Sequence, residues 1–229
     1  MDGRALRQAR LGKGWTQQQT AREFGVTQAY WSMFENGFRP VPPAVVRRAL
    51  RALKLPPTAL PLPGDQRLEE STTRKHDFSR ELGVLGYPGF AHLGGKAGLN
   101  PALLLFDALN EPDLDPRVRE GLPWLVLAYS DMDWNWLVKA VKLHDRQNRL
   151  GFAVAIAREV AGRKHEQGRS GKFKEYLEEL EPARLAREDT FCHDGMTQAE
   201  RKWLRQHRSS TAQHWNLLTD MRGERLAYD

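Results

Sequence analysis

Residues 15–37 constrain the fold more tightly than any other part of the chain. Thr16 and Gln19 have the spacing of a capping box, in which each side chain accepts from the other's backbone N–H, so a helix is predicted to begin there. Gly25 tolerates a positive φ and is predicted to end that helix. Thr27 is then placed to cap a second helix. The pattern therefore predicts two short helices joined by a tight turn.

Apolar residues repeat at helical spacing through the same segment. Ala21 and Phe24 share one face of the first predicted helix, and Trp31 and Phe34 share one face of the second. Residues upstream and downstream continue the helical spacing. Together they predict about five short helices across residues 3–55, with a small apolar core between them.

These residues resemble the Cro/repressor-type (XRE) helix-turn-helix family of phage repressors and bacterial regulators, over roughly the first quarter of the chain. The residues that carry the resemblance are Gln17, Ala21, Gly25-Val26-Thr27-Gln28, Ser32, Glu35-Asn36-Gly37 and Pro40. The resemblance implies that the second motif helix reads the major groove of double-stranded DNA. The chain departs from the family at Trp31, where Ile or Val is usual. The bulky pair Tyr30-Trp31 is expected either to rotate that helix or to contact a thymine methyl group.

The resemblance also implies roles for individual side chains. Gln17 is expected to bind a phosphate, and Asn36 and Arg39 are expected to contact the DNA backbone. Gln28, Ala29 and Met33 are expected to face the major groove. Arg10 and Glu35 match an internal salt bridge of some family members. The full DNA-binding set that we predict is Gln17, Thr27, Gln28, Ala29, Tyr30, Ser32, Met33, Asn36 and Arg39.

Side-chain chemistry and charge agree with DNA binding. A glutamine amide carries a donor and an acceptor side by side, which matches N6 and N7 of adenine. Residues 1–63 hold ten Lys and Arg against three Asp and Glu, a net charge of +7, whereas the remainder holds 25 against 26. Because phosphate contacts dominate affinity for DNA, positive charge confined to this end fits the role. The alternative is a helix-turn-helix that serves only as a protein-docking module.

Residues 55–63 carry four prolines and no charge, which is typical of an extended connector. We therefore predict a helix-turn-helix domain over residues 1–55, a Pro-rich linker over 56–63, and a helical partner-binding or dimerisation domain over 64–229. The second domain is expected to open with a polar, partly helical lead-in over 64–80.

Helix signals dominate the second domain, and no stretch alternates with a period of two, so the whole chain is predicted to be all-α. Proline follows an N-cap residue at Asn100-Pro101 and Asp115-Pro116, which predicts a helix start at each. Pro123 is expected to kink or break the second of these helices. The longest helix is predicted to begin at Asp131 or Asp133 and to run towards Gly162. Further helices are predicted over 173–180 and 182–187, and from the capping box at Thr197 to about 220.

Polar side chains interrupt the apolar face of that long predicted helix. The first interpretation of Gln147-Asn148-Arg149 is a buried hydrogen-bond network, and the second is a partner-binding groove. Trp134 and Trp136 lie two residues apart and cannot share one helical face, so one of them is expected to point into a neighbouring element or an interface. The candidate partner surface is therefore Trp134, Trp136, His144, Asn148 and Arg149.

Composition excludes several functional classes. A single cysteine, Cys192, excludes a disulfide framework and fits a cytoplasmic protein. The sequence shows no signal peptide and no apolar run long enough to span a membrane. It also lacks a P-loop, a nucleophile elbow and a metal-ligand cluster. We therefore expect no catalytic residue, no metal and no cofactor, and a protein that is not an enzyme.

Two functions remain open for the second domain. Residues 122–152 resemble antitoxin-like regulators encoded beside toxin genes, which implies an antitoxin that binds a cognate toxin and represses its own operon. The alternative is a ligand-responsive or constitutive dimeric repressor without a toxin partner. Both hypotheses predict a homodimer on a palindromic operator, with recognition helices roughly 34 Å apart.

Overall fold

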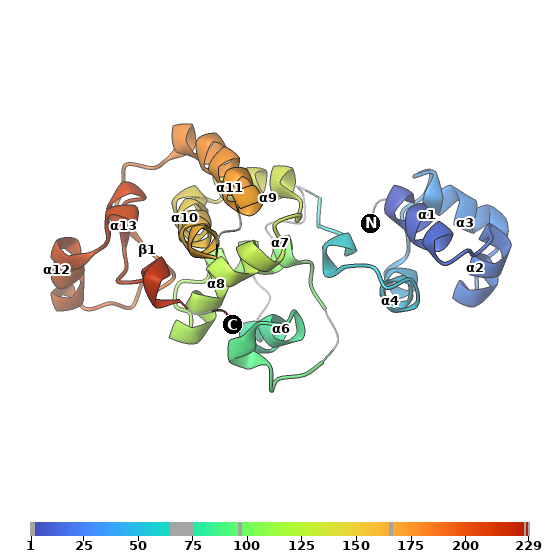
Figure 1. The fold of residues 1–229 in the computed structure, drawn as a ribbon, viewed down its shortest axis with the longest axis horizontal. Helices are drawn as coiled ribbons and strands as arrows, with labels where there is room; N and C mark the ends of the chain where they lie inside the picture. The colour runs from blue at the N-terminus through green and yellow to red at the C-terminus, as the bar shows by residue number, and fades with distance from the viewer. Residues whose placement is uncertain (1–2, 65–75, 96–97, 165–166, 227, 229) are drawn as a thin grey trace. The chain divides into compact units, whose positions relative to one another are not determined.

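Helices form most of the chain, and two very short strands are the other regular elements in the described residues. The computed structural model (Figure 1) describes residues 3–64, 76–95, 98–164, 167–226 and 228 of the 229. Most of the described residues are helical and very few lie in strands, so the predicted all-α fold is confirmed. The chain divides into two units, Met1–Pro63 and Gly64–Asp229, and each buries its own apolar residues.

Four α-helices surround the core of the first unit. They are α1 (Gly3–Gly12), α2 (Gln17–Phe24), α3 (Gln28–Glu35) and α4 (Pro43–Ala52), followed by the 3-10 helix η1 (Pro57–Ala59). Trp31 is fully buried in this core and stacks on Phe24, with ring centroids 5.0 Å apart. The fifth helix that we expected within residues 3–55 is not present there. The next helical turn is η1, which lies in the predicted linker. It is short because the prolines at 56 and 57 favour extended backbone before it and lack N–H donors.

Side-chain caps fix both ends of α2 and the start of α3. The Thr16 hydroxyl accepts from the backbone N–H of Gln19, and the Gln19 side chain accepts from the N–H of Thr16. Gly25 ends α2 with φ 67°, in the left-handed region that glycine tolerates best. Thr27 caps α3 by accepting from the N–H of Tyr30. The capping box, the turn and the second cap predicted from the sequence are all confirmed.

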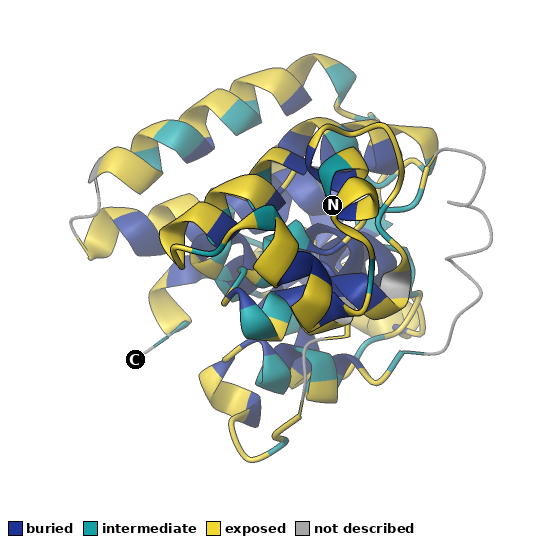
Figure 2. Ribbon diagram, turned by 90° about the vertical axis from the view of Figure 1, so that its right-hand side faces the viewer, coloured by how far each residue is buried: buried dark blue, intermediate teal, exposed yellow. Residues whose placement is uncertain are grey.

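The second unit is organised around α10, which is buried along most of its length. Its α-helices are α6 (Phe78–Val84), α7 (Pro101–Asn110), α8 (Pro116–Ala128), α9 (Trp134–Leu143), α10 (Gln147–Arg163), α11 (Gln167–Leu180), α12 (Gln198–His207) and α13 (Ser210–His214). Its short elements are η3 (Pro88–Phe90), η4 (Glu181–Ala183), β1 (Asp189–Thr190), β2 (Leu217–Leu218) and η5 (Gly223–Arg225). Helix α10 packs against both α8 and α11. Buried residues line the inner faces of the helices, and exposed residues cover the outer faces (Figure 2).

The single long helix predicted from Asp131 or Asp133 towards Gly162 is wrong. Helix α9 is capped by Asp133 and ends at Leu143, and α10 begins only at Gln147. Asp145 lies between them with φ 56°, a left-handed conformation through which a right-handed helix cannot continue. Because of this break, the three buried polar residues Gln147, Asn148 and Arg149 form the start of α10 instead of lying inside one continuous helix, as we had predicted.

Other predicted boundaries also need correction. Helix α8 continues through Pro123 without a break, because Pro123 and most of the residues from Gly121 to Leu127 are buried and hold the helix in place. The helix predicted over 182–187 is only the 3-10 turn η4, with Pro182 near its start. The helix predicted from Thr197 divides into α12 and α13, although its capping box with Glu200 is confirmed.

The strands β1 and β2 pair in parallel, with Asp189 opposite Leu217 and Thr190 opposite Leu218. This pairing fixes the segment before α12 against the segment after α13. The predicted helical lead-in over 64–80 falls largely on residues 65–75, which lie outside the described residues, and α6 begins at Phe78. Among the helices that the structure describes, none has both the length and the apolar character needed to cross a bilayer.

Candidate nucleic-acid interface

One buried carboxylate, that of Glu35, joins the three helices α1, α2 and α3. Its Oε1 accepts from Arg10 Nε at 2.6 Å and from Trp31 Nε1 at 2.6 Å. Its Oε2 accepts from Arg10 Nη2 at 3.0 Å and from Gln17 Nε2 at 2.9 Å. Glu35 is 4% exposed and Arg10 is 7% exposed, so the ion pair lies inside the unit. The four hydrogen bonds set the orientation of α3 relative to α1 and α2.

The same contacts keep Glu35 ionised. Burial by itself raises the pKa of Glu35, but the hydrogen bonds from Arg10, Gln17 and Trp31 outweigh it, so the pKa lies below its ordinary value. The hydrogen bond to Glu35 likewise raises the pKa of the Arg10 guanidinium. Glu35 is therefore only a hydrogen-bond acceptor in the folded unit.

A chain of amide hydrogen bonds leads from this carboxylate to the exposed face of α3. Because Glu35 only accepts, Gln17 must turn its NH₂ group towards Glu35 and its Oε1 away. That Oε1 accepts from Gln28 Nε2 at 2.7 Å. Gln28 is exposed and is left with its Oε1 acceptor and one remaining N–H donor. This is the donor and acceptor pair that the N7 and N6 groups of adenine require.

The residues predicted to face the major groove lie on the exposed side of α3. Gln28, Ala29, Tyr30 and Met33 are all exposed, and Tyr30 and Met33 rank among the few large apolar side chains that are exposed. A short, exposed helix with one glutamine and adjacent apolar groups can read adenine and thymine edges together. Thr27 is also exposed, although its hydroxyl already caps the helix.

Residues at the end of α3 are held by local contacts. The Asn36 amide donates to the backbone oxygen of Ser32 at 2.9 Å and to the Ser32 hydroxyl at 3.3 Å. Arg39 Nη1 donates to the Tyr30 hydroxyl at 2.7 Å, and its guanidinium lies 5.0 Å from the Tyr30 ring centroid. Tyr30 therefore orients Arg39 on the exposed face and leaves several of its N–H donors available.

The aromatic pair Tyr30-Trp31 divides between the surface and the core. Trp31 is fully buried, so it cannot contact a thymine methyl group, and that part of the expectation is wrong. Tyr30 is 40% exposed and remains available for such a contact. Its ring packs edge-on against Phe34, with centroids 5.8 Å apart.

Two features near this face were not predicted from the sequence. Phe38 follows α3 and is 80% exposed, between the two residues expected to contact the DNA backbone. Arg48 on α4 donates to the backbone oxygens of Glu23 and Phe24 and so caps the end of α2. The sequence gives no local signal that an arginine on a later helix will form such a cap. The position of Phe38 between Asn36 and Arg39, in contrast, can be seen in the sequence.

The candidate partner surface in the second unit is largely not a surface. Trp134, Asn148 and Arg149 are buried, so they cannot form a partner-binding groove. Trp134 stacks on Tyr176 of α11, with centroids 3.9 Å apart. Trp136 and His144 are partly exposed, and both rings pack edge-on against Phe106. The earlier interpretation of residues 147–149 as a buried network is confirmed.

In that network, Arg149 is bound on several sides. It donates to both carboxylate oxygens of Asp189 at 2.9 Å and to Asp194 Oδ1 at 3.1 Å. It also donates to the backbone oxygens of residues 109 and 111, both at 3.1 Å. Burial by itself lowers the pKa of Arg149, but Asp189 outweighs it and the net pKa is raised. Asn148 exchanges two hydrogen bonds with the backbone of Leu185. The network joins α10 to the end of α7 and to β1.

Cys192 lies beside this network and is fully buried. Burial raises the pKa of its thiol to about 12, so it is a neutral thiol at physiological pH. Within the described residues, no group of three or more His, Cys, Asp and Glu side chains could hold a metal ion.

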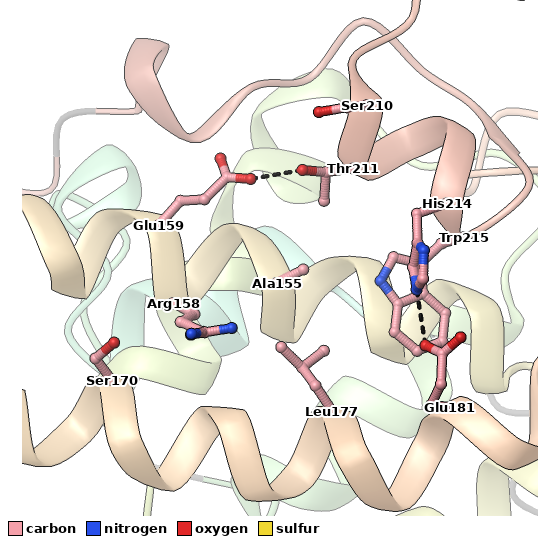
Figure 3. Close-up of a pocket in the computed structure, with 10 residues that line it drawn as sticks. All are labelled: Ala155, Arg158, Glu159, Ser170, Leu177, Glu181, Ser210, Thr211, His214 and Trp215. Atoms are coloured by element: carbon pink, nitrogen blue, oxygen red, sulfur yellow. Dashed lines mark hydrogen bonds and ion pairs between the residues drawn. The ribbon is translucent and has the colours of Figure 1, made fainter.

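An open groove of about 610 Å³ lies between α10, α11 and α13 (Figure 3). At one end Thr211 donates to Glu159, and at the other His214 lies 2.7 Å from Glu181. Ala155 and Leu177 line the groove between these two pairs. Four of its polar side chains therefore bond in two pairs across the groove.

Comparison with known proteins bears on the first unit. Residues 3–62 match the family model described as a helix-turn-helix domain, which covers roughly a quarter of the chain. No curated protein and no solved structure matches the chain. The match coincides with α1 to α4 and η1, including the two capped helices and the turn at Gly25. The N-terminal unit of this chain is therefore a helix-turn-helix domain, consistent with its resemblance to the Cro/repressor-type regulators.

Proposed function

We propose that this protein is a sequence-specific transcriptional repressor that reads double-stranded DNA with the exposed face of α3. The observation that carries the proposal is the oriented amide of Gln28. It presents one donor and one acceptor because Gln17 and Glu35 fix which way both amides point. The net charge of +7 on residues 1–63 supplies the attraction to phosphate.

The test is substitution of Gln28 by alanine in the full chain, with binding measured to a selected operator and to random DNA. We expect a loss of about 1–3 kcal/mol on the operator and a relaxed preference at one base step. Gln18→Ala is the matched control, because Gln18 is also an exposed glutamine but lies on α2. Equal weakening on operator and random DNA would exclude a base-reading role for Gln28.

We further propose that the protein acts in the cytoplasm as a homodimer on a palindromic operator. Repressors of this type place two recognition helices about one helical turn apart, roughly 34 Å, on two half-sites. Selection of binding sites from random DNA should then return an inverted repeat, and sedimentation should give two chains per site. A single, non-repeated half-site bound by one chain would contradict this arrangement.

For the second unit, we propose that it binds a cognate toxin, so that the protein is an antitoxin that represses its own operon. The resemblance of residues 122–152 supports this role, although only Trp136 and His144 of the candidate surface are even partly exposed. The test is a tagged pull-down from the native host after nuclease treatment. A stoichiometric protein encoded by the adjacent gene is the expected result. Recovery of the homodimer alone would favour the alternative, a ligand-responsive or constitutive repressor.

A further inference from the structure

A second cavity, of about 580 Å³, lies within the second unit between α8, α12 and the segments that follow β1 and β2. We call it the α12 cavity. Its apolar lining includes Met196 and Leu204, which form a small buried cluster with Leu218. Its volume is in the range of small-molecule sites in proteins. It shares no lining residue with the groove of Figure 3.

Trp203 gives this cavity an aromatic wall. Its side chain is 52% exposed, although it is one of the largest apolar groups in the chain. The ring of His207 stacks parallel to the indole, with centroids 4.5 Å apart and an interplanar angle of 12°. The stacking holds the indole at the edge of the cavity, where it can take a second planar group.

Opposite charges line the same cavity without pairing. Arg119 and Asp220 both border it, and both also border an adjacent cavity of about 270 Å³. Within the described residues, neither makes a hydrogen bond or ion pair through its side chain, and Arg119 Nε is buried without an acceptor. Arg119 as a residue is only partly buried and borders the cavity, so its guanidinium can donate to an acceptor placed there. Glu200, the other acid of the lining, is already bonded to Thr197 in the capping box.

We propose that the α12 cavity binds a small aromatic zwitterion of the amino-acid class. Its ring packs against Trp203 above the apolar lining, its carboxylate accepts from Arg119, and its ammonium group donates to Asp220. A ligand with only one charge would leave either Arg119 or Asp220 without a partner. Binding here does not depend on the proposed DNA function, because it is measured on the full chain in the absence of DNA.

Isothermal titration calorimetry with one indole series tests the class of ligand. The probes are L-tryptophan, tryptamine, which lacks the carboxylate, indole-3-propionate, which lacks the amine, and L-alanine, which lacks the ring. We expect L-tryptophan to bind about tenfold or more tightly than either singly charged analogue, because each analogue loses one charge-assisted hydrogen bond. Equal binding of the three indoles, or no binding of L-tryptophan at millimolar concentration, would overturn the proposal.

Three variants test the assigned contacts. Arg119→Gln should lower the affinity for L-tryptophan by about tenfold and leave the affinity for tryptamine unchanged. Asp220→Asn should also lower the affinity for L-tryptophan, but it should leave the affinity for indole-3-propionate unchanged. Trp203→Ala should weaken all three indoles. Arg158→Gln is the matched control, since Arg158 is an exposed arginine that lines the groove of Figure 3. Asp220 is exposed, so its variant reports on binding even if Arg119→Gln does not fold. Unchanged affinities in Arg119→Gln and Asp220→Asn would contradict the assignment.

Discussion

Replacing Glu35 by alanine should unfold or strongly destabilise the helix-turn-helix unit while leaving the second unit intact. The substitution removes the acceptor of four hydrogen bonds from three helices. Arg10 keeps its hydrogen bond to the backbone oxygen of Trp15 but loses its only ion-pair partner in the described residues. It is then a buried cation without a counter-charge.

The magnitude follows from what is left behind. Breaking a buried ion pair by removing one partner costs about 3–5 kcal/mol. The Trp31 N–H, which is fully buried, is also left without its acceptor, at a cost of about 1–3 kcal/mol. The two costs are not additive, because the smaller side chain leaves room for a water molecule that can satisfy part of both. Gln17 is partly exposed and can turn to solvent, so it adds little. We expect a total loss of about 3–5 kcal/mol.

Hydrogen exchange followed by mass spectrometry resolves the two units in the full chain. At about 1.4 kcal/mol per factor of ten, amides of α1, α2 and α3 should exchange roughly 10²- to 4 × 10³-fold faster in Glu35→Ala, and amides of α10 should not change. Glu23→Ala is the matched control, since Glu23 is an exposed glutamate on α2. Replacing both partners, as Arg10→Met with Glu35→Leu, should recover most of the loss because no buried charge remains. Protection no lower in Glu35→Ala than in Glu23→Ala would refute the reasoning.

Three further results are expected. The pKa of Glu35 is lowered in the folded unit, so the stability that Glu35 contributes is complete above the ordinary glutamate pKa of about 4.3 and is lost as pH falls through the folded pKa. Hydrogen exchange measured between pH 7 and 3 should show this loss of stability in α1 to α3. The same acid response in a Glu35→Gln chain would contradict it. Tyr30→Phe removes the hydroxyl that orients Arg39, so affinity should fall equally for operator and random DNA. Arg39→Ala should cause a larger loss and lower the slope of log affinity against log salt concentration by about 1. A loss in Tyr30→Phe that is confined to the operator would instead make Tyr30 a base contact. Cys192, with a pKa of about 12 and no exposure, should react with a thiol reagent on the order of 10³-fold more slowly in the native chain than in urea, and labelling at equal rates would show that its pocket opens.

Local chemistry made the first unit predictable. Thr16, Gln19, Gly25 and Thr27 act on backbone groups within a few residues of themselves, so their spacing alone predicts the caps and the turn that the structure contains. The orientation of the Gln28 amide, in contrast, depends on two hydrogen bonds between residues far apart in the sequence. Gln28 and Gln17 are 11 residues apart, and Gln17 and Glu35 are 18 residues apart. The sequence identifies the amide as a candidate but cannot say which way it points.

The second unit was less predictable because its decisive contacts are long-range. Asp145 is neither glycine nor proline, and although aspartate tolerates a positive φ better than most residues, the helical spacing around it did not predict φ 56° or the division of α9 from α10. The buried network around Arg149 could be suspected from three polar residues in an apolar helix. Its carboxylate partners lie 40 and 45 residues away, in a region where neither strand nor loop was predicted.

The contacts of Arg149 also bear on how the chain is made. Its backbone acceptors at residues 109 and 111 are synthesised before it, whereas Asp189 follows it by 40 residues. At about 5–20 residues per second, that interval lasts roughly 2–8 s. For most of it, the residues of α7, α8 and α10 are all present, but Arg149 still lacks its carboxylate partners Asp189 and Asp194. We therefore expect this interval to be when the apolar faces of these helices are most open to aggregation, and when a chaperone would matter most.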